Sequence, residues 1–191
     1  MAQDKKLHFL PTTYAEMTAR GWEYVDVVLV TGDAYVDHPS FGVALIGRLL
    51  EANGYRVAIL SQPRHHAPDD FRQFGKPRLF FGITAGNLDS IVANYSGNAK
   101  VRDRDDYSPG GNPYFGLEAE KKMRRRPDRA TILYSPLAHA INEKISLGIG
   151  QHRTAKPLLL VIIMHKTAQR RFDTPQNHHC VRICGPGEIA V

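Results

Sequence analysis

Three short apolar runs, separated by polar and amphipathic segments, dominate the first half of the chain. They lie near residues 25–30, 56–60 and 79–83 and are rich in Val, Ile, Leu and Phe, with little polar alternation. Runs of this kind are typical of strands that are buried on both faces of a sheet. We therefore expect three parallel strands in one sheet.

The segment between the first two runs has the spacing of an amphipathic helix over residues 41–53. Ser40 stands in the N-cap position, and Gly54 stands where a left-handed residue closes a helix. Strand, helix and strand together form a βαβ unit. The expected helix buries three apolar side chains against the sheet, namely Phe41, Leu45 and Leu49.

Weaker patterns extend this unit in both directions. Short helices are expected at residues 14–21, 69–74 and 88–94, and the polar, Gly- and Pro-rich stretch 96–113 is expected to form a long loop. These elements predict an α/β fold, a Rossmann-like three-layer sandwich with a mostly parallel sheet.

The regular pattern ends near Ser135. We divide the chain into a domain over residues 1–135 and a tail over residues 136–191. Apart from a lone apolar run at 158–164, no hydrophobic period ties the tail to the sheet. We therefore expect the tail to be irregular and poorly ordered, especially after about residue 150.

Cysteine content and hydropathy indicate in which cellular compartment the protein is expected. Two cysteines in 191 residues are too few for a secreted disulfide scaffold. The start has no apolar leader, and the longest apolar run, residues 157–164, is far shorter than the ~20 residues that span a bilayer. We expect a cytoplasmic protein without membrane contact.

The excess of positive charge is local. The formal charge of +6 is concentrated in the run Lys121–Arg126 and at the far end of the chain. This run lacks the interleaved aromatic residues on which nucleic-acid bases stack. We interpret it as the solvated end of the long loop, and nucleic acid is not indicated as a partner.

Polar residues with candidate chemistry follow the first apolar run. Asp33, Asp37 and His38 lie on the loop that leaves the carboxyl end of this strand, where open α/β sheets bind their ligands. They are candidate substrate-binding residues. The alternative interpretation is structural, with Asp37 capping the next helix and His38 filling the turn before Pro39.

A second candidate group follows the third apolar run. Thr84 and Asn87 flank a turn whose backbone N–H groups could meet an anion at a helix start. Asn87 could equally be only an N-cap. The isolated glycines match neither GxGxxG nor a Walker motif, so no nucleotide site is indicated.

Several of these segments carry a family resemblance. DAYVDHPSFG at 33–42, GRLLEANGYRV, GKPRLFFGITAGNLDSIVANYS and RRPDRATILYS, with FLPTT and DDYSPGG, resemble the N-terminal domain of YgiQ-type radical SAM proteins. The resemblance runs in order from about Phe9 to Ser135. It implies a Rossmann-like domain that precedes a partial barrel carrying a [4Fe-4S] cluster and S-adenosylmethionine. The substrate of the family is unknown.

Whether this chain is itself an enzyme is uncertain, because the cluster motif of the family is CxxxCxxC. Cys180 and Cys184 have the first spacing, but Gly187 stands where the third cysteine belongs. Two thiolates cannot supply the three ligands that such a cluster needs. We interpret the pair as coincidental and expect no metal site and no cofactor on this chain.

Two functional hypotheses follow. In the first, the chain is a non-catalytic N-terminal fragment of a radical SAM protein, with a truncation or a frameshift after about Ser135. Its partner would be the unknown small-molecule or macromolecular substrate of the family. In the second, it is a stand-alone α/β module that binds a ligand or a partner.

Overall fold

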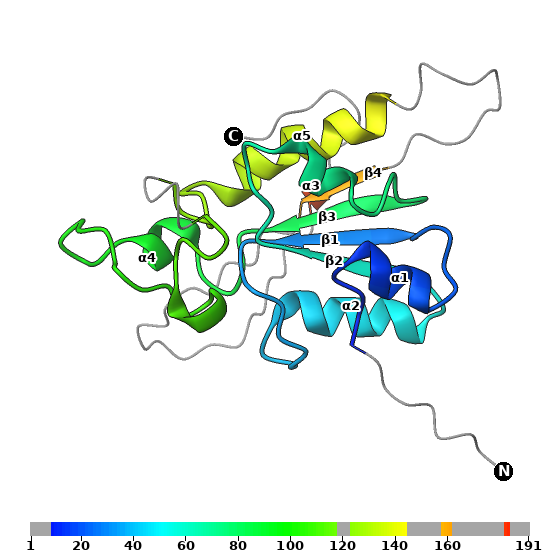
Figure 1. Ribbon diagram of the computed structural model, residues 1–191, viewed down its shortest axis with the longest axis horizontal. Helices are drawn as coiled ribbons and strands as arrows, with labels where there is room; N and C mark the ends of the chain where they lie inside the picture. Colours follow the sequence, from blue (N-terminus) through cyan, green and yellow to red (C-terminus); the bar gives the residue numbers. More distant parts are fainter. Residues whose placement is uncertain (1–8, 118–122, 145–157, 162–181, 184–191) are drawn as a thin grey trace, which may run out of the picture.

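A five-stranded sheet forms the centre of the molecule (Figure 1). The computed structural model describes residues 9–117, 123–144, 158–161 and 182–183. The strands lie in the order β2-β1-β3-β4-β5, and only the β4–β5 pair is antiparallel. Their bounds are β1 Val27–Thr31, β2 Val57–Ser61, β3 Phe80–Thr84, β4 Leu158–Val161 and β5 Arg182–Ile183.

The three strands expected from the apolar runs are confirmed, each displaced by one or two residues. Val27 of β1 pairs in parallel with Val57 of β2 and with Phe80 of β3. All five residues of β1 are buried. A strand that is buried on both faces needs apolar side chains at every position, which is why these runs show no alternation.

Helices cover both faces of the sheet (Figure 1). Helix α2, Gly42–Ala52, packs on one face against β1 and β2, and helix α5, Ala130–Lys144, packs on the other face against β3. Helix α3, Pro68–Arg72, lies beside α5. Two separate apolar clusters result, one on each face of the sheet. The α/β sandwich with a mostly parallel sheet is therefore confirmed.

Helix α2 lies where expected, but it buries a different side. Leu45 is 55% exposed and Leu49 is 62% exposed, so the prediction that they pack against the sheet is wrong. The buried positions are Gly42, Val43, Ala44 and Gly47, and Ile46 and Leu50 pack against the same cluster. A Cβ atom at Gly47 would lie 2.5 Å from Leu10 Cδ1, so the helix approaches closely through its smallest residues.

At the ends of α2, the prediction for the C-terminus is confirmed and the prediction for the N-cap is wrong. Gly54 has φ +89°, as a closing left-handed residue requires. The N-cap is Phe41 rather than Ser40, and it makes no side-chain capping bond. Ser40 instead donates its backbone N–H to His38 Nδ1.

The N-terminal segment runs along the free side of β2. Pro11 O accepts a hydrogen bond from Ile59 N–H at 2.9 Å. Helix α1, Tyr14–Ala19, follows at once and begins with a capping box between Thr13 and Glu16. This helix confirms the expected element at 14–21.

Helix α4, Ser90–Asn94, and the long loop lie beyond the carboxyl ends of the strands (Figure 1). The loop contains a single 3₁₀ turn, η1, at Pro109–Gly111. Tyr107 O accepts a hydrogen bond from Ala34 N–H at 2.7 Å, which fixes the loop against the end of β1. The loop therefore forms part of the sheet's carboxyl edge.

The expected domain boundary falls inside a continuous element. Helix α5 runs through Ser135, and Tyr134, Ala138 and Ile141 all belong to the core. Beyond it, β4 pairs in parallel with β3 within the apolar run at 158–164, where a lone buried strand was expected. Most of the tail, including Cys180 and Cys184, lies outside the described residues.

Candidate functional site

Asp33 belongs to a buried ionic cluster at the carboxyl edge of the sheet. It lies two residues after the end of β1, and Thr31 Oγ1 accepts its backbone N–H. Its Oδ1 accepts a hydrogen bond from Arg126 Nη2 at 2.5 Å, and its Oδ2 accepts one from the Asn87 backbone N–H at 2.6 Å. Both carboxylate oxygens are therefore already used within the protein.

Arg126 joins this aspartate to a second one. Its Nε donates to Asp105 Oδ2 at 3.2 Å, and its side chain has no exposed surface. Asp105 also accepts the hydroxyl of Ser108, so the long loop is tied to the cluster. The prediction of a solvated basic run is therefore wrong for Arg126, because its partners are distant in sequence.

The charges of the cluster do not balance, since two carboxylates share one guanidinium. Burial raises the pKa of Asp33 above its ordinary value, although the Arg126 charge and the Asn87 N–H oppose this shift. The nearby Asp105 carboxylate adds to the increase. The cluster is a structural clamp whose charged groups are sealed from solvent.

Two further candidates meet at this clamp. Thr84 Oγ1 accepts the Gly86 backbone N–H at 3.2 Å, and the Asn87 N–H bonds to Asp33 instead of facing an open anion site. Asp89, rather than Asn87, caps helix α4. Gly86 has φ +115°, and a Cβ atom there would lie 2.2 Å from Asp33 Oδ1. The structure thus brings Asp33, Thr84 and Asn87 together.

The other two candidates lie elsewhere on the loop after β1. Asp37 forms an ion pair with Arg48 of α2, and both of its oxygens accept from Arg48 Nε at 3.1 Å. Hydrogen bonds from Arg48 lower the pKa of Asp37. His38 is exposed, and its ring contacts the Ser40 backbone. Neither residue contributes to the buried clamp.

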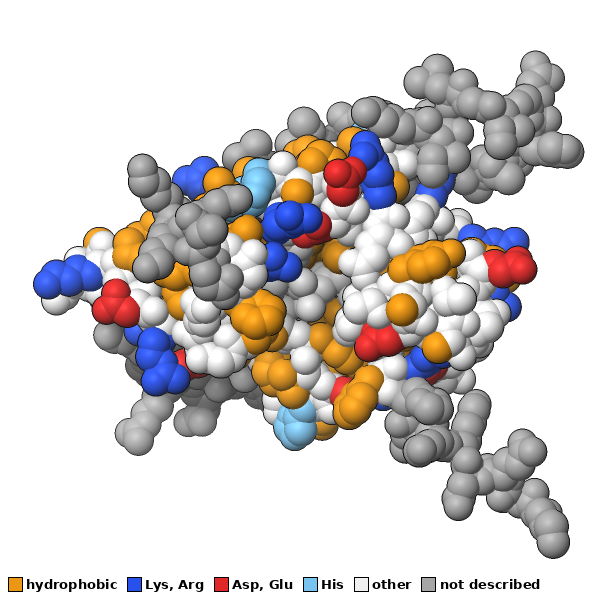
Figure 2. Space-filling model, in the orientation of Figure 1, with side chains coloured by type: hydrophobic (Ala, Val, Ile, Leu, Met, Phe, Trp, Pro, Cys, Tyr) orange, Lys and Arg blue, Asp and Glu red, His pale blue; other side chains and the backbone are white. Residues whose placement is uncertain are grey.

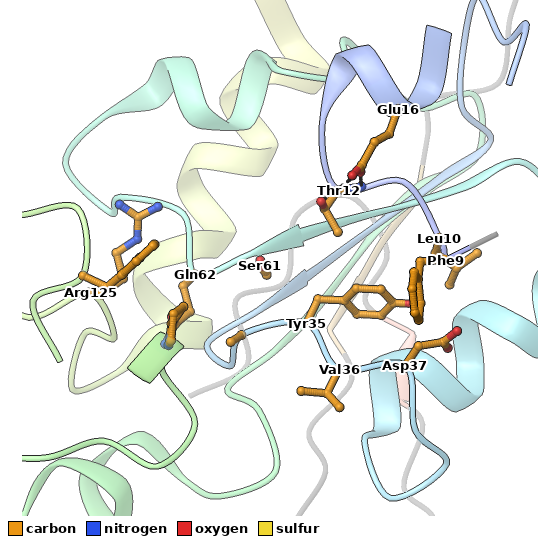
Figure 3. Close-up of a pocket in the computed structure, with 13 residues that line it drawn as sticks. Phe9, Leu10, Thr12, Glu16, Tyr35, Val36, Asp37, Ser61, Gln62 and Arg125 are labelled. Carbon is orange, nitrogen blue, oxygen red and sulfur yellow. Dashed lines mark hydrogen bonds between the residues drawn. The ribbon is translucent and has the colours of Figure 1, made fainter. Parts of the chain in front are cut away.

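A cavity of about 570 Å³ lies beside the clamp. Its walls come from the N-terminal segment with α1, from the loop at 34–37, from the end of β2 and from the loop before α5. Figure 3 shows Tyr35 and Gln62 on opposite sides of Ser61 at this site. Asp37 is the one candidate from the sequence that lines the cavity.

The mouth of the cavity is apolar. Three of its residues are large, exposed and hydrophobic: Phe9 (71%), Val36 (45%) and Phe115 (48%). In Figure 2, apolar side chains gather over the middle of this face. Exposed apolar groups that surround a hollow are typical of ligand-binding sites.

Gln62 forms the polar floor and was missed by sequence reasoning. It is buried and has φ +44°, a strained conformation for a residue other than glycine. Its Nε2 donates to Gly32 O at 2.9 Å and to Ser108 Oγ at 2.7 Å. The available signal was its place two residues after the second apolar run, the same place that Gly32 occupies after the first.

The described residues do not fit an iron–sulfur cluster. They contain no group of three or more His, Cys, Asp or Glu side chains placed to hold a metal ion. The 191 residues contain two cysteines, one thiolate short of the three that a radical SAM cluster requires. No chemical step is therefore assigned to such a cluster on this chain.

The fold and the cavity define a Rossmann-like α/β domain with a ligand-sized site at the carboxyl edge of its parallel sheet. Among the described residues, no helix has the length and hydropathy to cross a membrane. The family model described as radical SAM N-terminal matches residues 9–152, and the chain belongs to this family. The match extends past Ser135, where the resemblance was expected to stop.

Curated relatives support the same family. A UPF0313 protein from Thermotoga petrophila is 51% identical over 142 residues, which are 74% of this chain and 23% of the relative. UPF0313 proteins from Chromobacterium violaceum and Vibrio parahaemolyticus are each 48% identical over 142 residues, 74% of this chain and 17% of each relative. The chain thus spans less than a quarter of these relatives' length. No solved structure matches the chain.

Proposed function

We propose that this chain is the N-terminal binding domain of a UPF0313-type radical SAM protein and is not catalytic by itself. The family match over residues 9–152 supports the assignment to this part of such a protein. The radical SAM family implies S-adenosylmethionine and an iron–sulfur cluster for the complete protein. The domain's role is to hold a small-molecule or macromolecular substrate at its carboxyl edge.

One observation carries the non-catalytic part of the proposal. Cys180 and Cys184 are the only cysteines of the 191-residue chain. Cleavage of S-adenosylmethionine needs an electron from a cluster that is held by three thiolates, because iron in such clusters is ligated by soft anionic sulfur. The third thiolate is missing whatever the conformation of the tail.

The candidate residues take two roles in this proposal. Asp33, Thr84 and Asn87 hold the loops of the carboxyl edge in place through the buried clamp. Asp37 contacts the bound molecule through the cavity wall, and His38 contacts a macromolecular partner at the surface beside it. The low cysteine content supports the cytoplasm as the location.

Anaerobic reconstitution tests the proposal. The purified full chain is incubated with iron, sulfide, a reductant and S-adenosylmethionine, and cluster absorbance and 5′-deoxyadenosine are measured. We expect no stoichiometric [4Fe-4S] cluster and no 5′-deoxyadenosine. Absorbance near one cluster per chain that disappears in Cys180→Ala would overturn the proposal.

A stand-alone α/β module remains the second candidate. It is favoured by the cavity, whose walls come entirely from residues 9–125 of this chain. Translation of the gene in the other two frames downstream of the family match separates the two candidates. A continuation with CxxxCxxC supports the fragment, and meaningless sequence in both frames supports the module.

A further inference from the structure

We propose that the cavity beside Gln62 binds a small planar anion, an aromatic carboxylate or phosphate that also carries a hydrogen-bond donor. The inference deepens the proposed function by naming a ligand class, and it rests on that function only in assigning binding to this domain. Its first support is size. A volume of about 570 Å³ lies within the range of small-molecule sites, roughly 300–1,000 Å³.

The acidic side chains of the cavity wall already have hydrogen-bond partners within the protein. Asp37 pairs with Arg48. Glu16 accepts hydrogen bonds from the backbone N–H groups of Thr12 and Thr13 and from the Thr12 hydroxyl. These bonds lower the pKa of Glu16, with the Thr12 backbone as the largest cause. The carboxylates of Asp37 and Glu16 therefore do not indicate a cationic ligand.

Arg125 is the cation of the cavity wall. Its backbone N–H donates to Pro113 O at 2.7 Å, which fixes its place, and its side chain is half-buried. Among the described residues, its guanidinium has no hydrogen-bond or ion-pair partner. Asp70, whose carboxylate interacts electrostatically with Arg125, is held by Arg64 through Nη2 at 2.6 Å and Nε at 3.1 Å. A guanidinium in this position favours a carboxylate or phosphate, which it can bind through two parallel N–H groups.

The end of β2 supplies unused acceptors. The Gln62 side chain donates hydrogen bonds from Nε2 to Gly32 O and Ser108 Oγ. Its Oε1 accepts no hydrogen bond from the described residues. Ser61, the preceding residue, lines the same cavity, and its hydroxyl has no partner there either. A ligand that brings an O–H or N–H group can donate a hydrogen bond to Oε1 of Gln62.

The remaining wall suits a flat, apolar body. Burial, together with the Asp37 carboxylate, raises the pKa of Tyr35 to about 12, so its hydroxyl stays protonated. In the view of Figure 3 this ring extends toward Leu10 and Phe9, while Gln62 and Ser61 lie between it and Arg125. Phe115 and Val36 complete an apolar rim. Aromatic rings pack well against such surfaces.

The site is assembled before any ligand arrives. Gln62 is held by two side-chain hydrogen bonds, Asp37 by Arg48, and Glu16 by the capping box of α1. Binding therefore orders few side chains, which reduces its entropic cost.

Nuclear magnetic resonance titration of the ¹⁵N-labelled full chain tests the inference. The probes are 4-hydroxyphenylacetate and 4-hydroxyphenyl phosphate, with neutral 4-hydroxyphenylacetamide as the matched control. We expect the two anions to shift the Ser61 and Gln62 amide signals, including the Gln62 side-chain NH₂, and to bind more tightly than the amide. Loss of one charge-assisted contact in Arg125→Gln should weaken the anions about tenfold and leave the amide unchanged.

Arg129→Gln is the matched variant, because Arg129 is exposed near the start of α5 and lies outside the cavity. It should bind both anions like the unaltered chain. The inference is overturned if neither anion shifts these signals at millimolar concentration, or if Arg125→Gln binds the anions as well as Arg129→Gln does. Cluster reconstitution has a separate readout, so failure of either proposal is recognised independently.

Discussion

Asp33 and Arg126 are separated by 93 positions in the sequence and form a fully buried ion pair, with 2.5 Å between Oδ1 and Nη2. The pair joins the end of β1 to the segment that leads into α5. The loop residue Asp105 also forms an ion pair with Arg126. One guanidinium therefore joins the end of β1, the long loop and the segment before α5. The carboxyl edge of the sheet depends on this contact for its shape.

Removal of the cation should therefore be severe. Arg126→Met leaves two buried carboxylates without a counter-charge, and loss of one member of a buried pair costs about 3–5 kcal/mol. Urea unfolding at pH 7 measures the change in the free energy of unfolding. Arg129→Met, at an exposed position, should cost less than about 0.5 kcal/mol. A cost below about 1 kcal/mol for Arg126→Met would contradict a buried clamp.

The clamp should also be visible in the pH dependence of stability. Burial raises the pKa of Asp33 above the ordinary value of about 3.9. At pH values between the pKa of Asp33 in the unfolded chain and its raised pKa in the native state, the native state retains a proton that the unfolded state has lost. The free energy of unfolding therefore falls as the pH rises through this window. Asp33→Asn lacks this titration.

The measurement compares the two proteins by urea unfolding at several pH values from 4 upward. The free energy of unfolding of the unaltered chain, minus that of Asp33→Asn, should decrease with rising pH. Groups that do not interact with Asp33 titrate alike in both proteins and cancel in this difference. A difference that is constant or increases with pH would show that Asp33 is not held at a raised pKa.

Gly86 should tolerate no side chain. Its φ of +115° is strained for any other residue, and a Cβ atom would lie 2.2 Å from the Asp33 carboxylate. Strain of this kind costs about 1–3 kcal/mol by itself, and displacement of the clamp adds to it. Gly86→Ala should thus lose at least about 3 kcal/mol in thermal or urea unfolding. Gly97→Ala is the control, because a Cβ atom there meets nothing within 4 Å.

Truncation of an exposed leucine of α2 and truncation of a buried isoleucine of β2 should change the stability by very different amounts. Leu49 is largely exposed, so Leu49→Ala should change the free energy of unfolding by less than about 0.5 kcal/mol. Ile59 is fully buried in β2, and Ile59→Ala should cost about 2–5 kcal/mol. Equal losses in urea unfolding would mean that Leu49 is buried after all.

Tyr24 offers a test of cation–π stabilisation. The guanidinium carbons of Arg56 and Arg78 each lie 4.2 Å from the centre of its ring. Tyr24→Leu should lose about 1–2 kcal/mol, because each such contact contributes about 0.5–1 kcal/mol at partly exposed sites. Tyr24→Phe keeps the ring and should remain close to the unaltered chain in the same unfolding assay. A similar loss in both variants would assign the effect to the hydroxyl.

The sequence predicted the elements well because their signals are local. The apolar runs of β1, β2 and β3 reflect burial on both faces, and the capping box of α1 is contained within Thr13–Glu16. The buried face of α2 was predicted incorrectly because leucines were weighted by hydropathy. The structure instead turns Val43, Ile46 and Leu50 toward the sheet, and the close approach of Leu10 to Gly47 favours this face.

The candidate site was predicted only in part, because its contacts are distant in sequence. The loop after β1 could be placed at the carboxyl edge, and Asp37 does line the cavity. No local pattern distinguishes Arg126, which is buried, from the neighbouring Arg124 and Arg125, which keep partial exposure. Their difference arises from Asp33 and Asp105, which only the folded chain brings close.

The hydrogen bond from Ile59 to Pro11 has a further consequence for behaviour at high concentration. Strand β2 is the last strand on its side of the sheet, and an uncovered strand of this kind is a template for pairing with another copy of the chain. The segment that shields it, Phe9–Thr12, also walls the cavity. A molecule bound there would hold the shield in place, so occupancy of the cavity would also suppress self-association of the protein.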